Sequence, residues 1–91
     1  MKIINKISDF IELRCQISKK IALVPTMGSI HEGHISLVET AKKHGDTVVA
    51  TIFVNPIQFN NTEDYISYPK NFDKDVVNLE KNGVDILFCP S

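Results

Sequence analysis

The sequence predicts an α/β fold, a parallel sheet with flanking helices. Continuous apolar runs rich in β-branched residues, such as Thr47–Val54 (TVVATIFV), are typical of buried strands. Longer segments between these runs have apolar side chains three and four positions apart, as amphipathic helices do. Strands that alternate with helices in this way form a parallel sheet built from right-handed βαβ units.

The first elements are a short strand, a helix and a buried strand. Lys2–Ile4 is the candidate for the short strand. In the helix that follows, Ser8 is the expected N-cap, and apolar residues recur at helical spacing as far as Ile17. Ile21–Val24 is a continuous apolar run, which is typical of a buried strand, and Pro25 is expected to end it.

A second helix is expected from Gly33 to His44, with Gly45 as its stop. The central strand Thr47–Val54 then follows. The side chains expected to face the core from this helix are Ile35, Leu37, Val38 and Ala41.

A third helix is expected over Phe72–Lys81, where Asn82-Gly83 ends it. A final strand, Val84–Phe88, follows directly. The apolar contacts expected from this helix are Val76, Val77 and Leu79.

The composition excludes several classes of protein. The 91 residues include 10 basic and 11 acidic side chains, for a net charge of −1, so no basic surplus favours nucleic acid. No apolar run approaches the length of a membrane span, and no signal peptide is visible at the start. Cys15 and Cys89 form no CxxC pair, which favours a reducing compartment. We therefore expect a cytoplasmic protein without nucleic-acid or membrane partners.

The sequence stops directly after its last expected strand, at Cys89-Pro90-Ser91. Parallel sheets are covered by helices on both faces, and no crossover helix follows this strand. We therefore expect residues 1–91 to be the opening section of a longer α/β protein, so that the sheet is incomplete.

Ligands of open α/β sheets bind beyond the carboxyl ends of the strands, and Pro25–His34 lies at such an end. Gly28 allows a positive φ there, and a helix N-terminus favours phosphate oxygens. The segment is no P-loop, because His34 and Ile35 stand where Lys and Ser or Thr are required. It is a phosphate-sized site with two imidazoles, His31 and His34, which their spacing places on one helical face.

Two other interpretations of the histidine pair stay open. The imidazoles could bind a metal with Glu32 or His44 as a third ligand, although H-E-x-H is one residue short of the usual zinc pattern. They could also be purely structural, capping the helix and packing locally. Glu32 is most simply an acidic residue of the first helical turn, which the helix dipole favours.

The segment resembles the H-x-G-H signature of the nucleotidyltransferase superfamily. The likeness extends over P-T-M-G-x-x-H-x-G-H, the block Ile52-Phe53-Val54-Asn55-Pro56-Ile57-Gln58-Phe59, Glu63-Asp64 with Tyr68-Pro69-Lys70, and Gly83-Val84-Asp85 leading to Phe88-Cys89-Pro90-Ser91. In this order and spacing, nearly the whole chain is similar to the pantothenate synthetase (pantoate–β-alanine ligase) family. The resemblance implies the N-terminal part of a Rossmann-like domain that binds ATP and pantoate, and a C-terminal domain that these residues do not include.

The resemblance also implies roles for individual residues. His34 would be the catalytic histidine, assisted by His31. The ATP-binding turn would comprise Met27, Gly28, Ser29, Ile30, His31, Glu32, Gly33 and His34. Pantoate and β-alanine would contact Gln58, Pro25, Thr26, Met27 and Asn55. Asp64 and Tyr68 would lie in a loop that closes over the site, or would simply be solvated.

The implied reaction joins pantoate to β-alanine with ATP and Mg²⁺, through a pantoyl adenylate, and releases AMP and pyrophosphate. No residue of the chain is expected to be a dedicated metal ligand. The full-length enzyme would be a homodimer, and the 91 residues alone would be inactive. Two alternatives are another H-x-G-H nucleotidyltransferase and a non-catalytic piece that serves dimerisation or binding.

Overall fold

The computed structural model describes residues 1–53 and 71–90. Within them, strands and helices alternate in the order β1 (Lys2–Ile4), α1 (Ile7–Gln16), β2 (Ile21–Thr26), α2 (Glu32–His44), β3 (Thr47–Ile52), α4 (Phe72–Lys81) and β4 (Ile86–Phe88). The strands form one sheet in the order β1-β4-β3-β2, and all three neighbouring pairs are parallel. The predicted parallel α/β fold is confirmed.

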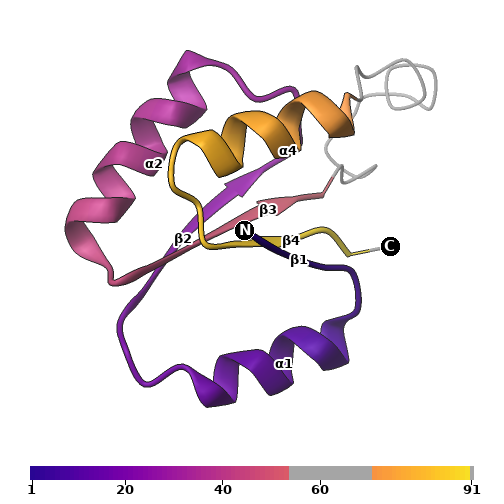
Figure 1. Ribbon diagram of the computed structural model, residues 1–91, viewed down its shortest axis with the longest axis vertical. Helices are drawn as coiled ribbons and strands as arrows, with labels where there is room; N and C mark the ends of the chain where they lie inside the picture. The colour runs from indigo at the N-terminus through magenta and orange to yellow at the C-terminus, as the bar shows by residue number, and fades with distance from the viewer. Residues whose placement is uncertain (54–70, 91) are drawn as a thin grey trace, which may run out of the picture.

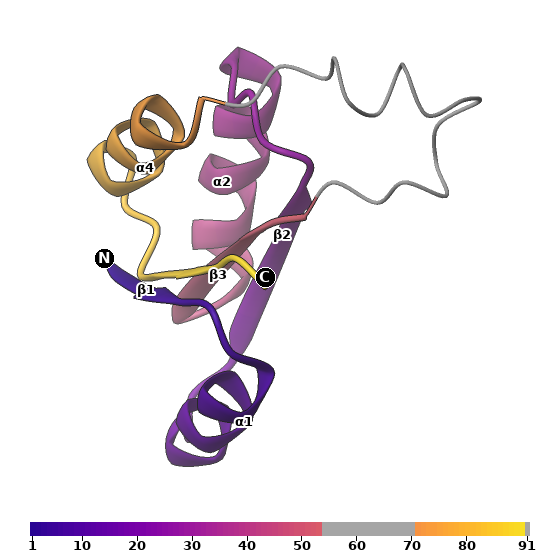
Figure 2. The same ribbon diagram turned by 90° about the vertical axis from the view of Figure 1, so that its right-hand side faces the viewer.

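The sheet is covered by helices on both faces. Figure 1 and Figure 2 show α1 on one face and α2 with α4 on the other. The core on the α2 and α4 side includes Val38, Leu79 and Leu87, whose side chains are fully buried. On the α1 side the rings of Phe10 and Phe88 stack with their centroids 4.6 Å apart. Each helix is therefore fixed by its own apolar stripe.

Two predicted boundaries near the N-terminus are wrong. Helix α1 begins at Ile7 after Lys6, and neither Lys6 nor Ser8 supplies a side-chain cap at this end. Strand β2 continues through Pro25 to Thr26 instead of ending before the proline. The carbonyl of Thr26 accepts from Phe53 N–H of the β3 side, so the alternating strand turns the nitrogen of Pro25 away from β3. Pro25 therefore costs the β2–β3 ladder no hydrogen bond.

The other element boundaries are close to those expected. Helix α4 has the predicted bounds, and α2 ends at His44 with Gly45 as its C-cap, as predicted, although Gly45 is extended with φ −140°. Helix α2 begins at Glu32, one residue before the predicted Gly33. Strand β3 ends at Ile52, two residues early, and β4 begins at Ile86, two residues late. Such differences are usual at element ends.

Two side chains predicted to face the core face solvent instead. Leu37 of α2 is 55 % exposed and Val77 of α4 is 63 % exposed. In α2 the buried stripe follows Val38 and Ala41, and in α4 it follows Asp75 and Leu79. Because these buried positions face the sheet, the adjacent apolar positions Leu37 and Val77 point to solvent.

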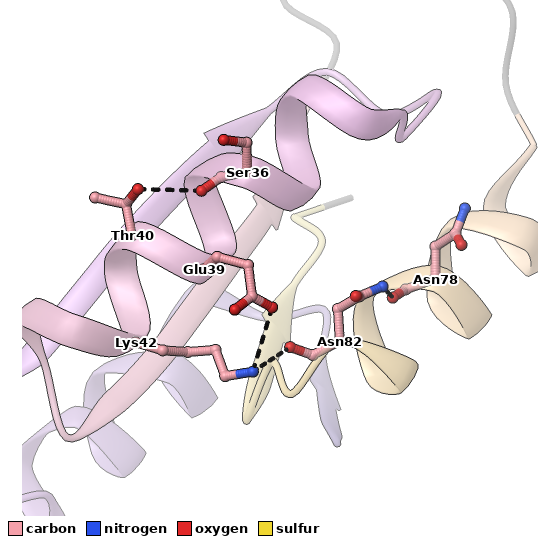
Figure 3. A network of polar contacts seen from close by, with 6 residues as sticks. All are labelled: Ser36, Glu39, Thr40, Lys42, Asn78 and Asn82. Carbon is pink, nitrogen blue, oxygen red and sulfur yellow. Dashed lines mark hydrogen bonds and ion pairs between the residues drawn. The ribbon is translucent and has the colours of Figure 1, made fainter.

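A polar network fixes α4 against α2 (Figure 3). The ammonium of Lys42 donates to the carbonyl of Asn82 at 3.0 Å and lies 3.6 Å from the Glu39 carboxylate. Asn82 in turn donates to the carbonyl of Asn78 at 2.8 Å. Lys42 thus places a positive charge at the negative end of the α4 dipole. Beside it Gly83 has φ +91°, and an added Cβ would lie 2.9 Å from the Lys42 nitrogen.

No helix in the part of the chain that the structure describes combines the length and the apolar character needed to cross a bilayer.

Candidate functional site

The turn between β2 and α2 lies at the carboxyl end of β2, as the sequence predicts. Its backbone is left-handed at two consecutive residues, with φ +85° at Gly28 and +53° at Ser29. This conformation is uncommon for a residue with a side chain, and it is kept only where the surroundings impose it. The turn is therefore held by its contacts, and two buried side chains provide them.

Thr26 is the first of these side chains. Its hydroxyl donates to the carbonyl of Thr51 at 2.8 Å and accepts from Gly28 N–H at 3.1 Å. The side chain thereby joins the ends of β2 and β3 to the start of the turn. The hydroxyl of this predicted substrate contact is thus already engaged within the protein.

Asp75 of α4 is the second. One carboxylate oxygen accepts from Ser29 N–H at 3.0 Å and the other from Ile30 N–H at 2.8 Å. The residue is 3 % exposed. Asp75 is not among the residues predicted for the site, although one signal is present in the sequence: its spacing of four from Leu79 places a carboxylate on the buried face of α4.

The two histidines form a capping box at the start of α2. His31 is the N-cap, and its Nδ1 accepts from Gly33 N–H at 3.0 Å. Nδ1 of His34 accepts from His31 N–H at 3.2 Å, and the ring centroids are 4.1 Å apart. The structure therefore brings the predicted pair together, but His31 precedes the helix instead of sharing a helical face with His34. The capping role, one of the alternative interpretations of the pair, is present.

Capping determines which ring nitrogen can serve a ligand. Since both Nδ1 atoms accept hydrogen bonds, each neutral ring has its proton on Nε2, which becomes the donor. Burial lowers the pKa of His34, and the nearby His31 lowers it further, while the Asp75 carboxylate acts in the opposite direction. His34 is therefore mainly neutral at pH 7. The site presents two N–H donors at a helix N-terminus, an arrangement suited to phosphate oxygens.

The remaining predicted residues of the turn surround this pair. Met27, Ser29 and His34 are half-buried, whereas Pro25, Glu32 and Gly33 are exposed. A Cβ added at Gly33 would come within 2.8 Å of the His31 ring, so glycine there leaves room for the cap. The site residues Asn55 and Gln58 lie outside the described residues, as do Phe59, Asp64 and Tyr68.

Cys89 lies at the carboxyl end of β4, where its N–H donates to the carbonyl of Ile4 at 2.8 Å. Burial raises the pKa of its thiol, and the thiol is therefore protonated at neutral pH. Within residues 1–53 and 71–90, no three His, Cys, Asp or Glu side chains are grouped so that they could hold a metal ion.

Comparison with known proteins gives a consistent result. Residues 2–91 match the family model described as pantoate-beta-alanine ligase. Pantothenate synthetase of Thermoanaerobacter sp. (strain X514) is 52 % identical over 94 residues, which cover 100 % of this chain and 33 % of that protein. The corresponding protein of Aliivibrio salmonicida is 49 % identical, over 92 % of this chain and 30 % of its own length.

Solved structures agree. The pantoate-beta-alanine ligase of Francisella tularensis, complexed with beta-gamma ATP and beta-alanine, superposes with a TM-score of 0.95 at 46 % identity, covering 100 % of this chain and 36 % of that one. Pantothenate synthetase of Thermus thermophilus gives a TM-score of 0.88 at 41 % identity, covering 100 % of this chain and 32 % of that one. The chain thus spans about a third of the length of these relatives. The chain belongs to the pantoate-beta-alanine ligase family.

Proposed function

We propose that the chain forms the ATP- and pantoate-binding part of an enzyme that condenses pantoate with β-alanine. A carboxylate oxygen of pantoate attacks the α-phosphorus of MgATP, the bond from that phosphorus to the pyrophosphate oxygen breaks, and pyrophosphate leaves. The amine of β-alanine then attacks the acyl carbon of the pantoyl adenylate and loses a proton, and AMP leaves. Such chemistry depends mainly on positioning and on stabilising the charge that develops on phosphate.

The observation that best supports this proposal is the capping box. It fixes the rings of His31 and His34 so that each neutral imidazole offers Nε2–H, and it does so beside the N-terminus of α2. In the proposed complex His34 donates to phosphate oxygens as charge develops, and His31 assists it. Met27 to Gly33 supply the turn that approaches the nucleotide. The ATP and beta-alanine bound to the Francisella tularensis relative support the same ligands for this chain.

The proposal of pantoate as the second ligand is supported by the family membership. Its proposed contacts are Pro25, Thr26, Met27, Asn55 and Gln58. The amide of Gln58 can both donate and accept, as a hydroxy acid requires. Mg²⁺ enters with ATP as part of the substrate. The enzyme is further proposed to be a cytoplasmic homodimer, and the 91 residues alone are proposed to be inactive.

A chimera tests the proposal. It joins residues 1–91 to the part of the Francisella tularensis ligase that follows the matched segment, with that ligase as the positive control. We expect AMP formation that requires both pantoate and β-alanine, and a rate about 100- to 1,000-fold lower in the His34→Ala variant, because a preorganised donor to developing charge is lost. AMP formation that is equal with unrelated acceptors would favour another nucleotidyltransferase. Equal rates of AMP formation in the chimera and in its His34→Ala variant would favour a non-catalytic role for residues 1–91.

A further inference from the structure

Asp75 is a buried carboxylate whose partners are backbone groups of the turn. Taking a carboxylate out of water is costly unless it is paired or hydrogen-bonded. The ion pairs found among the described residues, Met1 with Glu80 and Lys42 with Glu39, do not involve it. Its two oxygens accept instead from Ser29 and Ile30, which are 46 and 45 residues away along the chain. The carboxylate therefore serves the turn and not its own helix.

The carboxylate packs against the left-handed residues of the turn, Gly28 and Ser29. A Cβ added at Gly28 would come within 3.3 Å of the Asp75 Oδ2 atom and within 3.4 Å of Ile52. Gly28 thus permits both the positive φ and the close approach of the carboxylate. The two accepted N–H groups follow immediately, so their directions depend on the position of Asp75.

The same contact places the histidines. Ile30, held at 2.8 Å, directly precedes the N-cap His31, whose N–H is the donor to His34. A shift of Ile30 would move the N-cap and with it both rings. α4, which carries Asp75, is itself fixed to α2 by Lys42 and Asn82. The turn is therefore held from α4, the helix that lies beside α2 on the same face of the sheet.

We propose that Asp75 is a positioning residue of the nucleotide site, which holds the backbone of the turn so that the Nε2–H groups of His31 and His34 face the phosphates of ATP. This inference rests on the proposed function for the identity of the ligand. The role of Asp75 in the turn itself is independent of that ligand. Asp75 also raises the pKa of His34, against the effect of burial, which supplies a spectroscopic signature.

The test compares Asp75→Asn with Asp73→Asn. Asp73 is an exposed acidic residue in the same first turn of α4, so its variant matches the change in charge and dipole. The amide introduced by Asp75→Asn keeps one acceptor oxygen, but its NH₂ group faces the second N–H donor. In NMR spectra of the 91-residue chain, we expect Asp75→Asn to shift the amide signals of Ser29 and Ile30 and to lower the pKa of His34 further.

In the chimera, we expect Asp75→Asn to raise the KM for ATP about tenfold or more and to lower kcat, because a charge-assisted hydrogen bond is lost. Asp73→Asn should leave both values unchanged. Unchanged Ser29 and Ile30 amides in a folded Asp75→Asn chain, or an unchanged KM for ATP, would overturn the inference. If Asp75→Asn does not fold, Asp75→Glu is compared with the parent chain: displaced Ser29 and Ile30 amide signals together with a raised KM for ATP support positioning, and parent-like signals with a parent-like KM refute it. A chimera without any activity would refute the proposed function, while the amide shifts would still decide whether Asp75 holds the turn.

Discussion

Replacing His31 separates its two roles, capping and ligand binding. Its Nδ1 accepts from Gly33 N–H at 3.0 Å, and the side chain is exposed, so truncation opens no cavity in the core. Loss of an N-cap acceptor costs about 0.5–2 kcal/mol. We therefore expect His31→Ala to lower the free energy of unfolding by about 1 kcal/mol. Serine is a strong N-cap, so His31→Ser should stay within about 0.5 kcal/mol of the parent chain.

The assay is urea unfolding of the three chains, monitored by circular dichroism, together with the KM for ATP of the corresponding chimeras. Both variants lose the Nε2–H donor, and we expect both to raise that KM by a similar factor although their stabilities differ. If His31→Ala unfolds at the same urea concentration as the parent, the cap contributes nothing to stability. If His31→Ser keeps the parent KM, the ring has no part in binding ATP.

Three further perturbations test the turn and its supports by urea unfolding. Burial lowers the pKa of His34 below its ordinary 6.5, so near that pH the folded chain binds fewer protons than the unfolded chain. The contribution of the neutral ring to the free energy of unfolding should therefore be complete above pH 6.5 and be lost as the pH falls through the lowered pKa. His34→Gln can keep the capping box without titrating, and an equal pH dependence in that variant would contradict this account. Gly28→Ala should cost about 1–2 kcal/mol because its φ is +85°, and no loss would show that the turn relaxes. Gly83→Ala, at φ +91°, should cost a similar amount. Because an added Cβ would lie 2.9 Å from the Lys42 nitrogen, the loss should be smaller in a chain that also carries Lys42→Met. An equal loss with and without Lys42→Met would show that this contact does not contribute.

Local sequence patterns predict the ends of elements that are determined by residues adjacent in the chain. Helix α4 has its predicted bounds because its amphipathic stripe ends at Asn82-Gly83, and Gly83 adopts a left-handed conformation there. The α2 stop at Gly45 was also predicted. The apolar strands β2 and β3 are paired as a parallel α/β fold requires.

The errors arose where a distant part of the chain decides the outcome. Pro25 is compatible with β2 only because its nitrogen faces away from β3. Whether another strand pairs with that side of β2 depends on the order of the strands in the sheet. Ser8 satisfies the local rule for an N-cap, yet the N-cap of α1 is Lys6, two residues earlier, and the helix is fixed by packing of Phe10 against Phe88. Leu37 and Val77 are apolar, but the burial of Val38 and Leu79 turns them outward.

The candidate site shows the same division. The histidine pair and its glycines were visible in the sequence because they lie within one short motif. Asp75 was not, since an acidic residue in a first helical turn is ordinarily explained by the dipole, and its partners lie 45 and 46 residues earlier. The predicted contacts Asn55 and Gln58 stay predictions, because they lie outside the described residues.

The two capping imidazoles are proposed to present Nε2–H to the phosphates of ATP. The most direct measurement is a titration of the ¹⁵N-labelled chain with MgATP, in which the imidazole nitrogens of all three histidines are followed by NMR. His44, exposed at the other end of α2, is the internal control. We expect Nε2 of His31 and His34 to carry the proton before ATP is added and to shift saturably with it, while His44 does not respond. Protons on Nδ1, or equal shifts of all three rings, would contradict the account.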